Sequence, residues 1–274
     1  MNQIDSTTFW RHPRFPDLCL LKARFTQHRY ELHTHPTYVV ALITEGCEQL
    51  RIGSRRVSAP PGTVLIVHPE QCHDGEAGAA GGWSYRTLYP SVEFMTNVAR
   101  ELGEDASPVF ARCAIDDPVV AGALGAAHLD AERDDDDAEA SLIIAMRHLI
   151  ERHADRGRRT APMEFSGSSD RFADYAEAIE RDLTAPLDLA RLAALSGVTR
   201  FQVIRDFKRI TGLTPGTYLR NRRLRHATYL IRQGATAAHA AAAAGFSDQS
   251  HLSRTFKGIH GITPATFQRA HGNC

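Results

Sequence analysis

The most constraining feature of this 274-residue chain is the stretch 189–267, whose pattern occurs twice. Ten positions of the first copy align with ten positions of the second at a constant offset of 49 residues, and most of the pairs are identical. The first copy contains Arg205, Phe207, Lys208, Ile210, Gly212, Thr214, Pro215, Thr217, Tyr218 and Arg220. The second contains Arg254, Phe256, Lys257, Ile259, Gly261, Thr263, Pro264, Thr266, Phe267 and Arg269. Self-similarity at a fixed spacing indicates one supersecondary unit that is used twice.

Each copy carries the signals of two short helices joined by a glycine turn. Asp, Ser and Thr are favoured helix N-caps, and glycine is favoured after the last helical residue because it tolerates a positive φ. In the first copy these signals are Asp188, Gly197, Thr199 and Gly212. In the second they are Thr236, Gly245, Ser247 or Asp248, and Gly261. The pattern is that of a helix-turn-helix, whose second helix enters the major groove of DNA.

A helix that reads DNA needs an apolar back and a polar, basic front. Helical spacing predicts buried backs made of Val203, Phe207 and Ile210 in the first copy and Leu252, Phe256 and Ile259 in the second. The fronts, which are the candidate DNA-binding residues, are Phe201, Ile204, Arg205 and Lys208, and Gln249, Ser250, Ser253, Arg254 and Lys257. Arginine can bind guanine and glutamine can bind adenine with two hydrogen bonds, and each good pair discriminates by roughly 1–3 kcal/mol. The alternative is an ordinary helical bundle with solvated polar faces, and two aligned copies with matching Arg and Lys argue against it.

The residues GFSDQSHLSRTFKGIHGITPATF at 245–267, preceded by LARLAALSGVTRFQVIRDFKRITGLTP at 189–215, resemble the AraC/XylS family of bacterial transcription regulators. The resemblance covers about 175–270. It implies seven helices, with a long middle helix over 215–233 that places both recognition helices in successive major grooves. It also implies base contacts by Phe201, Ile204, Arg205, Gln249, Ser250, Ser253 and Arg254, and phosphate contacts by Lys208 and Lys257.

The chain departs from the family pattern in two places. Alanine stands at Ala237 and Ala240, where the family usually has isoleucine, and such a loss costs roughly 2–5 kcal/mol in a core that cannot adjust. The second helix-turn-helix unit is therefore expected to be looser or repacked. Ile204 stands where a polar base-reading residue is often found, and it can make only apolar contacts, for example to a thymine methyl group.

The charge is divided unequally although the net charge is zero. Residues 166–274 hold 15 Lys and Arg against 8 Asp and Glu, whereas residues 1–165 hold 17 against 24. A basic half beside an acidic half is typical of a DNA reader tethered to a different domain. In the basic half, the arginines at 222, 223 and 225 either contact phosphate or bind helix ends within the domain. We expect an effector-binding and dimerisation domain over 1–155, a linker over 156–170 and the DNA-binding domain over 171–274.

Cysteine usage and the polar first residues indicate an intracellular chain. The five cysteines are scattered and no Cys-x-x-Cys occurs, so neither a disulfide framework nor a zinc knuckle is expected. No apolar run is long enough to cross a membrane, and the first five residues cannot begin a signal peptide. We therefore expect a cytoplasmic protein with no membrane partner.

Short β-branched or alternating runs over 18–26, 37–44, 47–53 and 63–68 predict an antiparallel sandwich or barrel. A further strand should place Trp83, Tyr85, Thr87 and Tyr89 on one face, after a small, polar loop over 74–82. The pattern His33-Thr34-His35 followed by His73 resembles a cupin, a small jelly-roll barrel that precedes the DNA-binding half in many AraC-type regulators. The expected fold is thus an α+β multidomain chain: a cupin-like β-barrel with following helices, then an all-α domain with two helix-turn-helix units.

The barrel is the expected place for a small-molecule effector. Its candidate binding residues are His33, His35, His73, Tyr85 and Thr87. By a period of two, His33 and His35 should share one face of a strand, and His73 could join them. Three histidines can bind a first-row metal, but the metal-binding cupin pattern has a glutamate shortly after His-x-His, where this chain has Thr37 to Val40. Metal binding by His33, His35 and His73 therefore stays a weak alternative, and no cofactor is expected.

Three helices are expected between the barrel and the linker, over 92–102, 118–129 and 139–153. The last carries an apolar stripe of Leu142, Met146 and Leu149. Such a stripe packs on the barrel or pairs with its copy in a second chain, and the sequence favours both about equally. Dimerisation through these helices is what the family resemblance implies.

The function that follows is a sequence-specific, DNA-binding transcription regulator, not an enzyme, modulated by a small molecule in the cupin domain. The expected partners are double-stranded promoter DNA, the effector, a second copy of the chain and RNA polymerase. Two alternatives remain: a cupin metalloenzyme with an accessory helical domain, and a constitutive DNA-binding regulator whose barrel does not sense a ligand.

Overall fold

The computed structural model describes residues 5–16, 18–53, 55–155 and 168–272. The chain divides into two compact units, one formed mainly by residues before 155 and the other mainly by residues after 168. Most of the predicted linker, 156–167, lies outside the described residues. Each unit is presented by itself.

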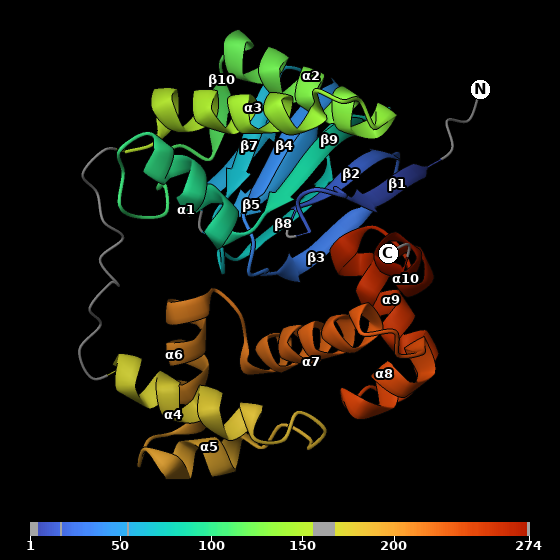
Figure 1. Ribbon diagram of the computed structural model, residues 1–274. Helices are drawn as coiled ribbons and strands as arrows, with labels where there is room; N and C mark the ends of the chain where they lie inside the picture. Colours follow the sequence, from blue (N-terminus) through green and yellow to red (C-terminus); the bar gives the residue numbers. More distant parts are fainter. Residues whose placement is uncertain (1–4, 17, 54, 156–167, 273–274) are drawn as a thin grey trace. The chain divides into compact units, whose positions relative to one another are not determined.

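The first unit is built on two β-sheets (Figure 1). The six-stranded sheet has the order β1 (Ser6–Arg11), β2 (Leu18–Phe25), β9 (Trp83–Pro90), β4 (Val39–Gly46), β7 (Thr63–Val67) and β10 (Ala114–Asp116). The four-stranded sheet has the order β3 (Arg29–His33), β8 (His73–Ala77), β5 (Glu48–Ile52) and β6 (Arg55–Ala59). The pairings of β2 with β9, β9 with β4, and β5 with both β6 and β8 are antiparallel. Two antiparallel sheets confirm the predicted cupin-like barrel.

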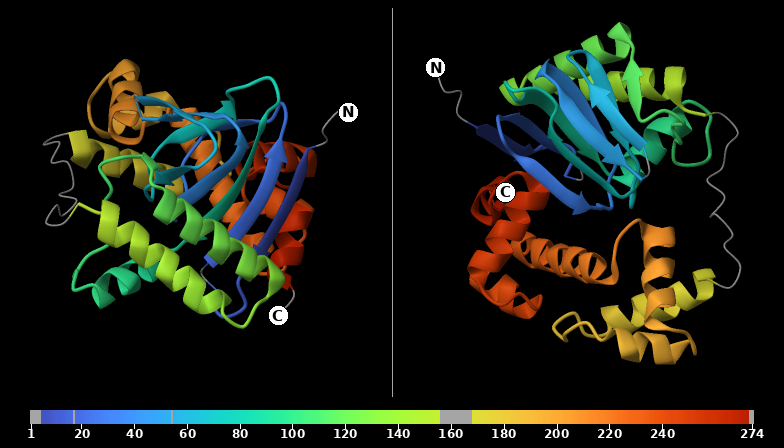
Figure 2. Two further views of the ribbon diagram at one scale, coloured as in Figure 1. Left: turned by 90° about the horizontal axis from the view of Figure 1, so that it is seen from above. Right: turned by 180° about the vertical axis from the view of Figure 1, so that it is seen from behind.

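The larger sheet has two different apolar faces. On one face Leu20, Val40 and Leu88 belong to a buried core shared with α1 (Val92–Glu101), α2 (Pro118–Arg133) and α3 (Ala138–His153). Figure 2 shows α2 and α3 side by side across this face in its left view. The opposite face turns inward and carries cross-strand pairs Leu21–Thr87, Ala23–Tyr85 and Phe25–Trp83. Because side chains alternate along a strand, the predicted face of Trp83, Tyr85, Thr87 and Tyr89 is the inward one.

The sequence analysis misplaced two features of the smaller sheet. The segment expected to be a loop over 74–82 begins with most of strand β8, His73–Ala77. His33 and His35 do not share a strand, because β3 ends at His33 and His35 lies in the connection that follows. The next residue, Pro36, has no N–H to donate, so the hydrogen-bonded ladder cannot continue through it.

The three predicted helices of this unit form close to their expected bounds. Helix α2 runs one turn further than predicted, to Arg133, and is capped at its start by the Asp117 carboxylate. It ends where Asp134 takes a left-handed conformation, with φ 55°. The acidic run that begins at Asp134 is thus the tight connection between α2 and α3, as a short polar segment between two helices should be.

The second unit consists of seven helices over its described residues, as the family resemblance implies. They are α4 (Ser168–Glu180), α5 (Leu189–Leu195), α6 (Arg200–Thr211), α7 (Pro215–Arg232), α8 (Ala237–Ala243), α9 (Gln249–His260) and α10 (Pro264–Gly272). The long helix α7 joins the group α4–α6 to the group α8–α10 (Figure 1). Each group contains one helix-turn-helix, α5–α6 and α8–α9.

The local signals set the ends of these helices as predicted. The carboxylate of Asp188 and the hydroxyl of Thr199 accept hydrogen bonds from the first turns of α5 and α6. Asp248, rather than Ser247, caps α9. Gly212 and Gly261 end α6 and α9 in the left-handed region, with φ 74° and 70°. This conformation is costly for residues with a Cβ, which explains the glycines at equivalent positions of the two copies.

The alanine-rich helix α8 is a formed part of the second unit. Thr236 caps it, and Ala240 and Ala244 are fully buried. The helix contacts both α7 and α9, where Leu252 and Phe256 are also fully buried. Small side chains are therefore part of this core, and Ala240 leaves the helix-turn-helix geometry intact.

Candidate DNA-reading helices and barrel interior

The front of α6 is exposed where the sequence analysis placed DNA-binding residues. Val203 and Phe207 are fully buried, so they fix the back of the helix against the domain core. Phe201 is 78% exposed although it is aromatic. Arg205 and Lys208 are also exposed, whereas Ile204 is half-buried. Phe201 is thus accessible on the front of the helix, and its role in DNA contact stays a prediction.

The front of α9 repeats this arrangement. Its back is formed by Leu252, Phe256 and Ile259, all of which are buried. The exposed front residues are Gln249, Ser250, Arg254 and Lys257, while Ser253 is half-buried. Arginine and lysine are therefore exposed at equivalent positions of both helices. Their roles as base and phosphate contacts stay predictions.

The back of α6 also holds a buried carboxylate that the sequence analysis missed. Asp206 is fully buried, and Nε of Arg171 on α4 donates to its Oδ2 at 3.1 Å. Nε2 of Gln202 and Nη2 of Arg209 donate to its Oδ1 at 2.8 Å and 3.3 Å. The signal was present in the sequence, because Asp206 lies three residues after Val203 and one before Phe207. A carboxylate on that arc needs a cationic partner.

The arginines of α7 are engaged within the domain. Nε of Arg223 donates to the carbonyl of Leu183 at 2.6 Å, and its Nη2 donates to the carbonyl of Ala185 at 2.9 Å. Arg222 forms an ion pair with Glu180 at the end of α4. Two roles were considered for these arginines, phosphate contact and binding within the domain. Arg222 and Arg223 take the second role: Arg222 binds the end of α4, and Arg223 binds the segment that follows it.

The three predicted histidines of the barrel lie close together. His33, His35 and His73 each offer one ring nitrogen, and these nitrogens lie within 4.8 Å of one another. His33 and His73 are buried, and His35 is half-buried. The rings of His35 and His73 meet edge to face, with their centroids 4.6 Å apart.

Hydrogen bonds orient two of these rings. Nδ1 of His33 faces the carbonyl oxygen of Glu31 at 2.6 Å, and Nδ1 of His73 faces that of Gln71 at 2.8 Å. A carbonyl oxygen can only accept, so Nδ1 carries the hydrogen in both rings. Burial lowers the pKa of His73 to about 4.

The other two predicted effector residues, Tyr85 and Thr87, are buried on the inward face of β9. Tyr85 stacks on Trp83 with a centroid distance of 6.3 Å and an interplanar angle of 13°. The two residues thus lie on the same inward sheet face as Tyr89, whose ring is 6.0 Å from that of His35. Whether any of the five binds an effector stays a prediction.

Glu48 is a buried acid that the sequence analysis did not single out. It is 6% exposed, and it lies on the same face of β5 as buried Leu50 and Ile52, which is the inward face. Burial raises the pKa of Glu48 to about 8. Burial, and next the charge of Glu48, also raise the pKa of Tyr89. The alternation in β5 was the available signal, since it puts a carboxyl group where apolar residues belong.

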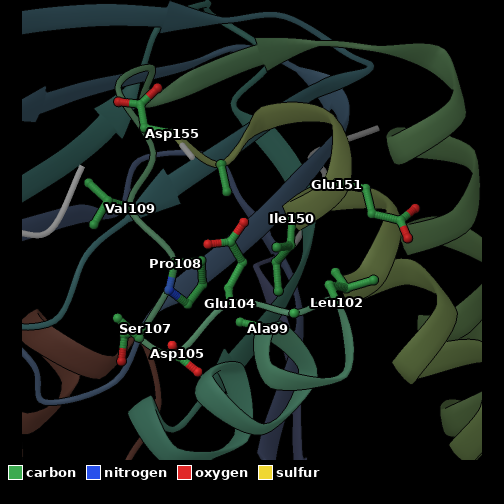
Figure 3. A pocket seen from close by; sticks show the side chains of 13 residues that line it. Ala99, Leu102, Glu104, Asp105, Ser107, Pro108, Val109, Ile150, Glu151 and Asp155 are labelled. Carbon is green, nitrogen blue, oxygen red and sulfur yellow. The ribbon is translucent and has the colours of Figure 1, made fainter. Parts of the chain in front are cut away.

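A cavity of about 310 Å³ lies on the outside of this unit (Figure 3). It is bounded by the end of α1, the segment 102–109 and the end of α3. Acidic residues, Glu104, Asp105, Glu151 and Asp155, are prominent in its lining. None of the predicted effector residues lines it, so this cavity and the barrel interior are separate places.

Over the described residues, none of the helices combines the length and the apolar character that crossing a membrane requires.

Comparisons with known proteins agree with this architecture. The sequence profile of the AraC-like ligand binding domain matches residues 15–150, and that of a helix-turn-helix domain matches residues 192–270. An uncharacterised HTH-type transcriptional regulator, YbfI of Bacillus subtilis (strain 168), is 25% identical over 227 residues, which are 82% of each chain. The multiple antibiotic resistance protein MarA of Escherichia coli (strain K12) is 30% identical over 91 residues, or 33% of this chain and 72% of MarA.

A solved structure shares the fold over nearly the whole chain. The crystal structure of ToxT from Vibrio cholerae O395 has a TM-score of 0.55 at 11% identity, and the match covers 98% of this chain and 99% of ToxT. The fold class predicted from the sequence is thereby confirmed for both units. With two family profiles on the expected halves and relatives that are transcription regulators, the chain belongs to the AraC/XylS family: a transcription regulator with an AraC-like ligand-binding domain and a helix-turn-helix domain.

Proposed function

We propose that this regulator binds promoter DNA sequence-specifically through α6 and α9, and that a small molecule held inside the barrel modulates the binding. The observation that carries the DNA-binding part is the recurrence of exposed cations. Arg205 and Lys208 on α6 correspond to Arg254 and Lys257 on α9, and all four are exposed. Helix backs fixed by buried Phe207 and Phe256 support rigid presentation of these cations.

The two cations on each helix have different proposed roles. Arg205 and Arg254 read base edges, together with Phe201, Ile204, Gln249, Ser250 and Ser253. Lys208 and Lys257 lie one turn further along and bind phosphate, which fixes register without reading sequence. Two recognition helices on one rigid domain then span two successive major grooves, whose centres are about one helical turn of DNA apart.

The effector part of the proposal rests on the character of the barrel interior. The family profile that matches this unit is that of a ligand-binding domain. ToxT has been solved bound to (E)-4-(8-methylnaphthalen-1-yl)but-3-enoic acid, in a structure with a TM-score of 0.54. In the present chain, buried polar residues on the inward side, such as His73, Thr87 and Glu48, would bind an effector with polar groups of its own. His33, His35 and Tyr85 complete the proposed site.

The effector acts by shifting a population between two states of the protein, which requires different effector affinities in those states.

A second copy of the chain is proposed as a partner, since Val119 on α2 and Ile144 on α3 are each 50% exposed. The other proposed partners are promoter DNA and RNA polymerase, and the proposed location is the cytoplasm.

The decisive experiment is in-vitro selection of genomic fragments by the full chain at near-physiological salt, followed by sequencing. The expected result is a shared motif of two short blocks about one helical turn, or ~10 base pairs, apart. Binding that is weak, blind to sequence and strongly salt-dependent, with and without added metabolites, would contradict recognition by two tandem helices.

The two remaining alternatives predict different results. A regulator whose barrel does not sense a ligand would select the same motif with the same affinity whether or not metabolites are added. A cupin metalloenzyme would select no motif and would turn over a substrate when loaded with metal.

A further inference from the structure

A carboxyl group without a partner lies inside the barrel unit. Glu48 is the first residue of β5 and is 6% exposed, on the inward face with Leu50 and Ile52. Over the described part of the chain its carboxyl group forms no hydrogen bond and no ion pair. Buried acids are normally paired, and an apolar residue would fill an unpaired position at a lower free-energy cost. Glu48 therefore has the character of a binding group whose partner comes from outside the chain.

Two further polar atoms, on the inward face of β9, also lack partners. The indole Nε1 of Trp83 and the hydroxyl of Thr87 form no hydrogen bond over the described residues, and each residue is 1% exposed. Buried polar atoms without a hydrogen bond are few in native proteins. Ordered water would pair with an indole and a hydroxyl, so the class of occupant is decided by the carboxyl group and by the rings beside it.

The chain brings Glu48 to the Trp83 end of β9. Gly46, at the end of β4, is the register partner of Trp83. The N–H of Cys47 donates to the carbonyl of Gly82 at 3.3 Å, and Glu48 follows directly in the sequence. Strand β5 therefore starts beside Trp83, with the side chain of Glu48 on the inward side.

Aromatic rings cover the inward face of the larger sheet at this end. Trp83 stacks on Tyr85 with centroids 6.3 Å apart, and the ring of Phe25 on β2 lies 5.5 Å from that of Trp83. The face of an aromatic ring attracts a cation, and tryptophan does so most strongly. From this geometry we propose that Glu48 anchors a small organic cation, an amine whose ammonium group pairs with the carboxylate and whose body packs on Trp83 and Tyr85.

The unpaired atoms of β9 add a second requirement to this chemical class. The indole N–H of Trp83 can only donate, so the amine should carry a hydroxyl or carbonyl oxygen that accepts from it. The hydroxyl of Thr87 can pair with either kind of group. An amino alcohol meets these requirements. The inference names the chemical class of the effector, and its regulatory part rests on the proposed function.

Proton release distinguishes a cation from a neutral occupant. Burial raises the pKa of Glu48 to about 8, so the ligand-free protein holds this carboxyl group neutral at pH 7. An ammonium ion pairs with the ionised form. One proton therefore leaves Glu48 for each amine that binds, and the total charge is conserved. A neutral ligand would bind without this release.

The elements packed against β5 bring other titratable groups to the inward side. Burial, and next the charge of Glu48, raise the pKa of Tyr89 on β9, whereas burial lowers the pKa of His73 on β8 to about 4. The register partners of Glu48 on β6 and β8 are Ala59 and Ala77, which carry no charge. The remaining titratable side chains on this side include those of Tyr85 and His35, so a variant of Glu48 must assign the proton.

Calorimetry on the full chain with two matched pairs of compounds tests the site. Phenylethanolamine is compared with phenylethylene glycol, and isopropanolamine with propylene glycol; in each diol a hydroxyl replaces the ammonium group. The expected result is one amine per chain, bound at least ~10-fold more tightly than its diol. Buffers with different ionisation enthalpies should show the release of one proton, and affinity should rise roughly tenfold per pH unit between about pH 6 and pH 7.5. Equal affinity for amine and diol, or binding of neither amine, would overturn the proposal.

Matched variants assign the binding to Glu48. Glu48→Gln keeps the shape of the side chain and removes its charge, so it should weaken amine binding at least ~10-fold and abolish the proton release. Its ligand-free melting temperature should be at or above that of the wild type, because no native partner is lost. Glu76→Gln, which alters an exposed carboxyl group on β8, is the control and should bind the amine like the wild type. Unchanged affinity in Glu48→Gln, or proton release that persists there, would overturn the assignment.

The readouts separate this inference from the proposed function. Amine binding and proton release are measured without DNA, so they support the site even if no DNA motif is selected. Conversely, a selected motif supports DNA reading even if no amine binds. The regulatory part requires that phenylethanolamine or isopropanolamine change the affinity for the selected DNA in the wild type and not in Glu48→Gln, and unchanged affinity would overturn that part.

Discussion

Nε of Arg171 lies 3.1 Å from Oδ2 of Asp206, and this ion pair ties α4 to the back of the recognition helix α6. Asp206 is fully buried, whereas its equivalent in the second copy, Thr255, is a buried but uncharged residue. A buried carboxylate that loses its cation is strongly destabilising, because the remaining charge is uncompensated. The first helix-turn-helix therefore depends on an ion pair that the second does not need.

Arg171→Met should lower the melting temperature of the helical domain by about 5–10 °C, since Gln202 and Arg209 still contact the carboxylate. The control is Arg181→Ala, which removes an exposed pair with Glu177 on the same helical segment and should change little. The double variant Arg171→Met/Asp206→Leu should recover most of the loss. Thermal unfolding followed by circular dichroism measures all three, and equal effects of Arg171→Met and Arg181→Ala would contradict the assignment.

The two turn glycines provide a second matched comparison. Both have positive φ, 62° at Gly197 and 80° at Gly245. A Cβ at Gly197 would meet nothing within 4 Å, whereas at Gly245 it would lie 2.7 Å from the backbone oxygen of Leu183 and 2.7 Å from Cα of Thr184. Gly197→Ala should thus lower the free energy of unfolding by about 1–2 kcal/mol, which is the cost of a left-handed backbone for a residue with a Cβ. Gly245→Ala should cost clearly more, because backbone atoms must move. Urea unfolding of both variants measures which one loses more free energy of unfolding. Similar losses would contradict the prediction, because they would show that the backbone near Gly245 moves away from the added Cβ at no cost.

The helix ends could be predicted well because the interactions responsible for them are local. Asp188, Thr199 and Gly212 act within a few residues of themselves, so their caps could be predicted to the residue. Pro36 was also a local signal, but the period-two prediction for His33 and His35 overlooked it. The partner of Asp206 could not be identified in this way, because Arg171 is 35 positions away and only the packing of α4 brings them together.

In the barrel, too, the features that could be predicted from the sequence are those set by local signals. The inward face of β9 could be predicted because alternation along a strand is local. The convergence of His73 with His35 depends on how separate segments of the chain pack, so it was expected from the cupin resemblance and not from any local signal. Glu48 was overlooked because a carboxyl group usually marks a solvated position, and the buried neighbours on β5 override that expectation.

His128 makes the stability of the barrel unit sensitive to acid. It is fully buried between α2 and the larger sheet, where Nη1 of Arg86 donates to Nδ1 at 2.9 Å and Nε2–H donates to the carbonyl of Leu21 at 3.2 Å. Both ring nitrogens are thus used by the neutral form. Burial, and next the charge of Arg86, lower the pKa of His128 to about 4, against opposing effects of the Leu21 carbonyl and Glu132.

The direction of the pH effect follows from proton binding. Between pH 6.5 and about 4 the unfolded chain binds a proton at this histidine and the folded chain does not, so stability falls as the pH falls through this window. The contribution is fully present above pH 6.5. From pH 7.5 to pH 5, His128→Gln should lose about 2 kcal/mol less unfolding free energy than the wild type. Urea unfolding at the two pH values measures this, and parallel losses would exclude His128 as the source.

Arg254 and Lys257 on α9 should give different losses when each is replaced by alanine. Both are exposed, and both lie on a helix whose back is fixed by Leu252 and Phe256, so neither change should affect folding. A base contact discriminates between sequences, whereas a phosphate contact contributes equally to all of them. Arg254→Ala should therefore lower the binding free energy for the selected site by roughly 1–3 kcal/mol and relax the base preference at one position of that site.

Lys257→Ala is the matched comparison, three residues along the same helix. It should weaken binding about equally on the selected site and on unrelated DNA, and it should reduce the slope of log affinity against log salt by about one, because one fewer counterion is released. Fluorescence anisotropy at several salt concentrations, on the selected site and on a scrambled one, measures both effects. Equal losses of Arg254→Ala on the two sequences would refute its role in reading bases and leave it a phosphate contact like Lys257.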